Sequence, residues 1–161
     1  MFTNGELQLT TERRQKYRGT AKINLDQISF PASQTREIDP KNVERLCRIF
    51  SKDGCHRLDM RNHITAVVSK RQLKRARHAA RVTAQELLRN PSDQYPHLDF
   101  STERVQCLHG QHRIKAGEEV LPPNEQWWTV DLYLDGVLSS VSPSWALLID
   151  LTSLSPPRYQ L

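Results

Sequence analysis

The apolar positions of the chain switch repeatedly between the two-residue spacing of strands and the three- and four-residue spacing of helices. Four stretches with alternating or β-branched apolar residues predict strands: 22–28, 64–68, 105–108 and 127–134. Four stretches predict helices, beginning at Pro40, Lys70, Arg113 and Pro143. This order predicts an α/β (α+β) fold in which helices cover a small mixed sheet.

Local signals place the ends of several of these elements. Asp39 followed by Pro40 is a typical helix start, and Gly54 a typical stop. Within that helix, Cys47 lies on the apolar stripe and is expected in the core. The helix over 70–89 carries apolar residues on one face and ends at Asn90-Pro91.

At 161 residues the chain is long enough for one domain with its own core. Residues 1–20 are polar, partly basic and aperiodic, which predicts a flexible arm. We expect the folded domain over 21–140. The segment 141–161 predicts a helix and a tail, and it reads like the broken end of a longer chain.

The composition excludes several classes of protein. No run approaches the roughly 20 apolar residues of a membrane span, and residues 1–20 lack the apolar core of a signal peptide. Three cysteines at irregular spacing argue against a disulfide framework. A cytoplasmic or nuclear protein is expected.

The net charge of +5 is concentrated in one segment. Residues 70–89 hold seven Lys or Arg and one acid, which leaves 16 basic and 17 acidic residues elsewhere. Such a segment predicts contact with nucleic acid or another polyanion, although a solvated helix face has the same pattern. The expected contact residues are Lys70, Arg71, Lys74, Arg75, Arg77 and Arg81.

The densest polar chemistry lies in the turn between the strand 105–108 and the helix that follows. This turn contains His109, Gly110, Gln111, His112 and Arg113. A glycine turn before a helix leaves backbone N–H groups open to an anion, and the arginine adds a cation beside them. The turn therefore predicts a phosphate site, against the alternative that the two histidines only bond to loop carbonyls.

This order of elements resembles the ParB/sulfiredoxin-like superfamily, whose phosphate-binding turn has the pattern Gly-x-[His/Arg]-Arg. The matching residues are Gly110, His112 and Arg113, and Arg36 resembles an earlier arginine of the ParB type. The runs Cys107-Leu-His-Gly-Gln-His-Arg-Ile and Trp127-Trp-Thr-Val-Asp-Leu-Tyr-Leu resemble a large, uncharacterised family of fungal proteins often associated with mobile elements.

The resemblance implies binding of a nucleoside triphosphate, CTP or ATP, with Mg²⁺ as its companion ion. It does not imply sulfiredoxin chemistry, because Gln111 stands where that enzyme has its reactive cysteine. Gly54-Cys55-His56-Arg57 has the sulfiredoxin tetrad but no helical pattern after it, so we expect an ordinary loop there. The chain has no counterpart of the ParB helix-turn-helix.

Other chemistries have weaker support in the sequence. Cysteine and histidine residues near Cys55 and Cys107 suit zinc, but they lack the paired spacing of zinc modules, so no metal site is expected. Glu118 and Glu119 could serve as a base or cation ligand, or could only complement the helix N-terminus.

The expected function is thus a nucleotide-binding ParB/sulfiredoxin-like module associated with nucleic acid, with catalytic residues unknown. Two alternatives stay open. One is a phosphotransferase or NTPase that uses the same turn. The other is a non-catalytic interaction domain, or a degenerate fragment of a mobile-element-associated fungal protein.

Overall fold

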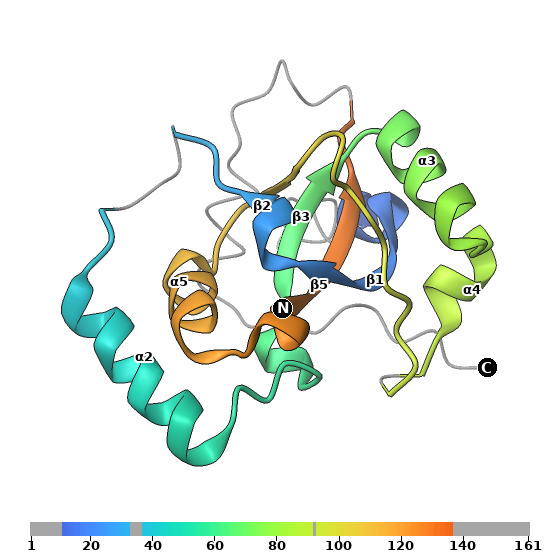
Figure 1. Cartoon of the computed structure of the whole chain (residues 1–161). Helices are drawn as coiled ribbons and strands as arrows, with labels where there is room; N and C mark the ends of the chain where they lie inside the picture. Colours follow the sequence, from blue (N-terminus) through green and yellow to red (C-terminus); the bar gives the residue numbers. More distant parts are fainter. Residues whose placement is uncertain (1–10, 33–36, 92, 137–161) are drawn as a thin grey trace, which may run out of the picture.

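The computed structural model describes residues 11–32, 37–91 and 93–136, and it contains a five-stranded mixed sheet with helices at its sides (Figure 1). The strand order is β1 (Tyr17–Asn24), β5 (Trp127–Leu134), β3 (Ile64–Val68), β4 (Val105–Cys107) and β2 (Ile28–Ser29). β1 and β5 are antiparallel, as are β3 and β4, whereas β5 is parallel to β3 and β4 to β2. The predicted α/β class is confirmed.

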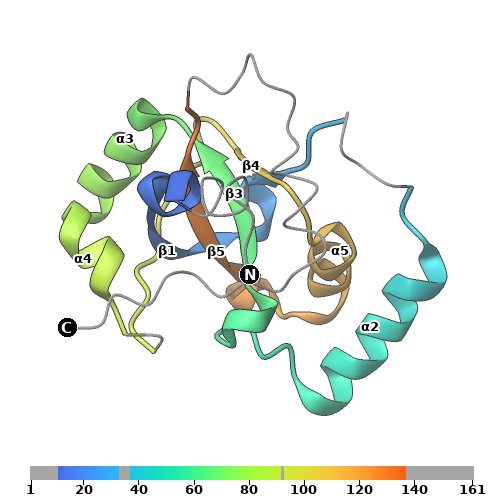
Figure 2. The ribbon, with the colours of Figure 1, turned by 180° about the vertical axis from the view of Figure 1, so that it is seen from behind.

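Two pairs of helices flank the sheet. α2 (Pro40–Asp53) and α5 (Gln111–Val120) lie together at one side, and α3 (Lys70–Ala80) and α4 (Ala84–Arg89) at the other (Figures 1 and 2). Single 3-10 turns occur at Leu25–Gln27, Met60–Asn62 and Pro123–Glu125. No helix of the described segments is long and apolar enough to cross a membrane.

One face of the sheet forms the apolar core. Trp128, Val130 and Leu132 of β5 are fully buried, and they share a cluster with buried residues of three helices. α3, α4 and α5 contribute Leu73, Leu87 and Ile114, among others. The core therefore joins both pairs of helices to β5, the strand between β1 and β3.

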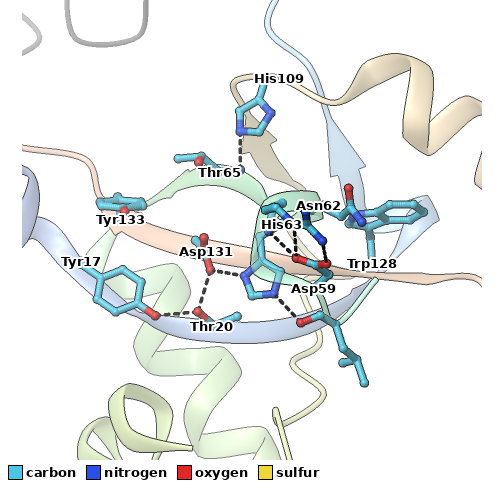
Figure 3. Close-up of polar contacts among 12 residues, drawn as sticks. Tyr17, Thr20, Asp59, Asn62, His63, Thr65, His109, Trp128, Asp131 and Tyr133 are labelled. Atoms are coloured by element: carbon cyan, nitrogen blue, oxygen red, sulfur yellow. Dashed lines mark hydrogen bonds and ion pairs between the residues drawn. The ribbon is translucent and has the colours of Figure 1, made fainter. Parts of the chain in front are cut away.

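The opposite face of the same strands is buried but polar. Asp131 Oδ1 accepts a hydrogen bond from Thr20 at 2.7 Å and lies 3.0 Å from His63 Nδ1, and the hydroxyl groups of Tyr17 and Thr20 are 2.6 Å apart (Figure 3). Burial raises the pKa of Tyr17, so its phenol stays protonated. Buried polar groups with partners of this kind favour one register of β1 on β5.

This polar face explains why the start of the first strand was predicted wrongly. β1 begins at Tyr17, and residues 11–16 are helical, so the described part of the expected arm is ordered structure. Tyr17 and Thr20 pack on the polar face, where apolar alternation gives no signal. At the other end the strand stops at Asn24, because the backbone N–H of Leu25 turns to bond Gln126.

The helix predicted over 70–89 is also two helices. Arg81 adopts a left-handed conformation (φ 56°, ψ 41°), and its N–H closes the end of α3. Thr83 then starts α4 with a reciprocal capping box to Glu86. The capping box was visible in the sequence, but the continuous apolar period across it concealed the break.

The other predicted ends agree closely with the structure. α2 starts after its N-cap Asp39 and stops at Gly54, and α4 ends before Asn90. Cys47, however, is only half-buried, because α2 packs mainly on α5 and lies away from the sheet (Figure 1). The predicted helix from Pro143 lies outside the described residues.

Gly19 is a position where the fold requires glycine. Its φ is +129°, and a Cβ there would overlap the carbonyl and side chain of Leu87 in α4. We expect Gly19→Ala to lower the free energy of unfolding by about 2–6 kcal/mol, because strained backbone and overpacking each cost about 1–3 kcal/mol. Urea unfolding would measure the loss.

Gly54→Ala is the matched control. Gly54 also has a positive φ, +86°, but the nearest atom to a Cβ there is 4.0 Å away. Only the backbone cost of about 1–3 kcal/mol applies. Equal losses in the two variants would contradict the close contact between β1 and α4.

Candidate anion site at the start of helix α5

The turn before α5 is shaped by Gly110. Gly110 is the N-cap of the helix and has a left-handed conformation (φ 92°, ψ 14°). A Cβ at this position would lie 2.7 Å from Cδ1 of Ile64, in the central part of the sheet. α5 begins at Gln111, two residues earlier than predicted, because the glycine completes the reversal in a single residue.

The first turn of α5 has open backbone donors. Gly110 has no side chain to cap the helix. Among the described residues, the N–H groups of Gln111, His112 and Arg113 have no hydrogen-bond acceptor. These groups, together with the positive end of the helix dipole, favour an anion at this point.

Arg113 supplies a cation that the described part of the fold does not neutralise. Its side chain is half-buried and has no hydrogen bond or ion pair to any described residue. Burial lowers the pKa of this guanidinium from its ordinary value, which shows that it has lost water. Helical side chains lean toward the N-terminus, so we expect Arg113 to lie over the same open turn.

The two histidines of the turn accept hydrogen bonds from neighbouring elements. His109 Nε2 accepts the backbone N–H of Thr65 in β3 at 3.0 Å (Figure 3). His112 Nε2 accepts the backbone N–H of Asp39, the N-cap of α2, also at 3.0 Å. Since Nε2 is the acceptor in both, each neutral ring carries its proton on Nδ1.

The remaining turn residues are placed as follows. Gln111 is half-buried at the first position of α5, and its side chain has no bond to the described residues. Arg36 lies outside the described residues. The structure thus brings together His109, Gly110, Gln111, His112 and Arg113, with the start of α2 beside them.

The basic segment lies elsewhere. Lys70, Arg71, Lys74 and Arg75 are exposed on α3, and Arg81 is exposed just after it. Arg77 is half-buried, and its guanidinium donates to the carbonyl of Val82 at 3.4 Å. Five of the six predicted contact residues are therefore free to meet a partner, and none of them is part of the turn.

Glu118 and Glu119 lie in the last turn of α5, about 10 Å along the helix from its start. The predicted role of these carboxylates in complementing the helix N-terminus is therefore wrong. Glu118 is 3.7 Å from Lys115, and Glu119 accepts from the thiol of Cys47 at 3.5 Å. Their position gives no support to a role as a base at the phosphate site.

The sulfiredoxin-like tetrad at 54–57 is a loop with a structural arginine. Arg57 donates to the carbonyls of Glu125 and Trp127 at 2.6 and 2.9 Å, and it pairs with the Glu125 carboxylate at 3.0 Å. Its guanidinium also stacks 3.6 Å from the ring centre of Trp127. These contacts tie the loop to the start of β5, a role that no sequence pattern indicated.

The polar face of the sheet holds further residues that the sequence analysis did not single out. His63, besides its contact with Asp131, has Nε2 3.3 Å from the carbonyl of Leu58. Thr129 Oγ1 is buried without a hydrogen-bond partner among the described residues. Alternating polar residues in the 127–134 strand were the available signal, but they are equally typical of a solvated face.

The three cysteines are unsuited to thiolate chemistry. Burial raises the pKa of Cys47, Cys55 and Cys107, and the carboxylate of Glu119 raises that of Cys47 further. Cys107 is fully buried in β4, as the sequence predicted. No group of three or more His, Cys, Asp or Glu that could hold a metal occurs in the described part of the chain.

We expect alkylation by iodoacetamide to reflect these raised pKa values. At pH 8 Cys47 and Cys55 should react more slowly than free cysteine, because less thiolate is present, and their rates should still climb above pH 9. Cys107 should react only after unfolding. Peptide mass spectrometry after timed quenching measures each site, and rapid labelling of Cys55 at pH 7 would contradict this assignment.

Comparison with known proteins gives one match. A family model described as the N-terminal domain of a protein of unknown function (DUF3723) matches residues 16–147. No curated protein and no solved structure matches the chain.

Proposed function

We propose that this chain, which belongs to the family described as the N-terminal domain of a protein of unknown function (DUF3723), binds the phosphates of a nucleotide at the start of α5. The observation that carries the proposal is Arg113, a half-buried guanidinium without a partner among the described residues. A cation that has lost water and gained no counter-charge is costly, and a bound phosphate would offset that cost.

Each residue of the turn has a role in this proposal. The open N–H groups of Gln111, His112 and Arg113 donate to phosphate oxygens, and the guanidinium of Arg113 neutralises them by a forked contact. His112 offers Nδ1–H as a further donor, because Nε2 is occupied by Asp39. His109 keeps the turn against β3.

The ligand that we propose is a nucleoside triphosphate, ATP or CTP. The resemblance of Gly110, His112 and Arg113 to the ParB/sulfiredoxin-like turn supports this choice. Mg²⁺ would enter with the triphosphate and bind its oxygens, since this ion commonly binds through substrate phosphates and water. Nucleic acid, the other predicted partner, would bind the separate surface of α3.

We do not extend the proposal to phosphoryl transfer. Glu118 and Glu119, the carboxylates suited to act as a base, are in the last turn of α5, far from the open donors. The module we propose therefore binds its ligand without a residue assigned to chemistry.

Arg113→Gln should weaken nucleotide binding by about 10- to 150-fold, because one charge-assisted contact contributes about 1.5–3 kcal/mol. Isothermal titration with ATP, CTP, GTP and UTP, each with Mg²⁺, measures this loss. Lys115→Gln is the matched control, since Lys115 is an exposed cation of the same helix and pairs with Glu118.

Two results would overturn the proposal. One is the absence of binding to any of the four nucleotides at millimolar concentration, which would favour a non-catalytic interaction domain. The other is equal affinity of the wild-type protein and Arg113→Gln. Thermal unfolding of each variant separates loss of the site from loss of the fold.

A further inference from the structure

We propose that the outer face of α3, together with the loop 101–104 beside it, is an interface for the phosphate backbone of duplex nucleic acid. This surface is distinct from the α5 turn, and the proposal does not depend on nucleotide binding there. The partner is a polymer, and the α3 surface would recognise its charge and shape and not its base sequence.

The first observation is the number of unpaired cations on α3. The helix Lys70–Ala80 contains five Lys or Arg, one His and no acidic residue. Lys70, Arg71, Lys74, Arg75 and His78 are exposed, and none forms an ion pair with a carboxylate of the described residues. Two exposed cations on other elements do have such partners: Arg48 pairs with Glu44, and Arg61 with Asp59.

The second observation is that the cations are displayed on a rigid support. Leu73 and Ala76 bury the inner side of α3 in the core. Ser69 and Gln72 form a capping box at its start. A helix held in this way loses little backbone freedom when its outer residues meet a partner.

The third observation adds a loop to the surface. The side-chain amide of Gln72 donates to the carbonyls of Glu103 and Arg104 at 3.1 and 3.3 Å. Arg75 donates to the hydroxyl of Thr102 at 3.4 Å. The loop is therefore attached along α3, where it adds one exposed cation, Arg104, beside one exposed carboxylate, Glu103.

The residue types favour nucleic acid over a membrane. The exposed side chains of α3 include no large apolar residue that could enter lipid, since Leu73 is buried. They also include no Phe, Tyr or Trp on which an unpaired base could stack, and His78 supplies a single small imidazole ring. Lys and Arg alone match a duplex backbone, which has one negative charge per roughly 1.7 Å of axis, and α3 extends about 16 Å.

The two surfaces do not adjoin, because the length of β3 separates them. The turn before α5 bonds to Thr65 near the start of β3, whereas α3 begins two residues after β3 ends. The strand between them is roughly 13–16 Å long, and Figures 1 and 2 place α3 and α5 at opposite sides of the sheet. Duplex binding should therefore be the same with and without ATP.

The test uses two labelled 20-base-pair duplexes of unrelated sequence and fluorescence anisotropy over a range of salt concentrations. The test variant carries Lys70→Gln, Arg71→Gln, Lys74→Gln and Arg75→Gln. The matched control carries Lys41→Gln, Arg45→Gln, Arg48→Gln and Lys52→Gln, which removes four exposed cations from α2 and gives the same net charge. Thermal unfolding verifies that both variants fold.

We expect the wild-type protein to bind both duplexes alike, and the α3 variant to bind at least about tenfold more weakly, with a salt slope reduced by up to about four. The α2 control and Arg113→Gln should keep wild-type affinity. Equal weakening in both four-residue variants would reduce the effect to net charge and overturn the proposal. So would failure to bind duplex at low salt, or tighter binding to anionic vesicles.

Discussion

The contact between Gly110 and Ile64 is the constraint on which this side of the molecule depends. Because no Cβ separates the turn from Ile64, the first turn of α5 lies directly against β3. α2 in turn packs mainly on α5 and is bonded to it through His112 and Asp39. β3, the turn, α5 and α2 thus form a series in which each element is placed by the one before it.

Sequence patterns predicted the elements that bury one apolar face. They failed for β1, where the buried side chains are polar. The strands at 64–68 and 127–134 and the helix after Asp39 agree with the structure because their side chains follow a single period. β1 was placed late, since Tyr17 bonds to Thr20, and Thr20 in turn bonds to Asp131, which is more than 100 residues away. The glycine turn before a helix was predicted, but the hydrogen bonds that its histidines accept from Thr65 and Asp39 depend on tertiary contacts that no local pattern encodes.

The two basic regions of the molecule are suited to different kinds of anion. At the α5 turn a single half-buried guanidinium belongs to the same helical turn as the open N–H groups, and a small phosphate ligand is what we propose there. On α3 several exposed cations share one outer face, and each interaction is weak and screened by salt. Under our proposal, the affinity of α3 for a polyanion comes from the number of its cations, because each contact with a phosphate releases counterions.

The residues that look most reactive in the sequence are the ones that the fold itself uses. Cys55 has a raised pKa, Arg57 is bonded to two carbonyls and a carboxylate, and each histidine of the turn accepts a backbone N–H. Arg113 is the contrasting case, because burial has removed water from a charge that the described residues leave unpaired. Arg57, whose bonds are completed within the fold, has little capacity left for a ligand. Arg113, which has no partner among the described residues, is therefore a stronger guide to function than the Cys-His-Arg motif.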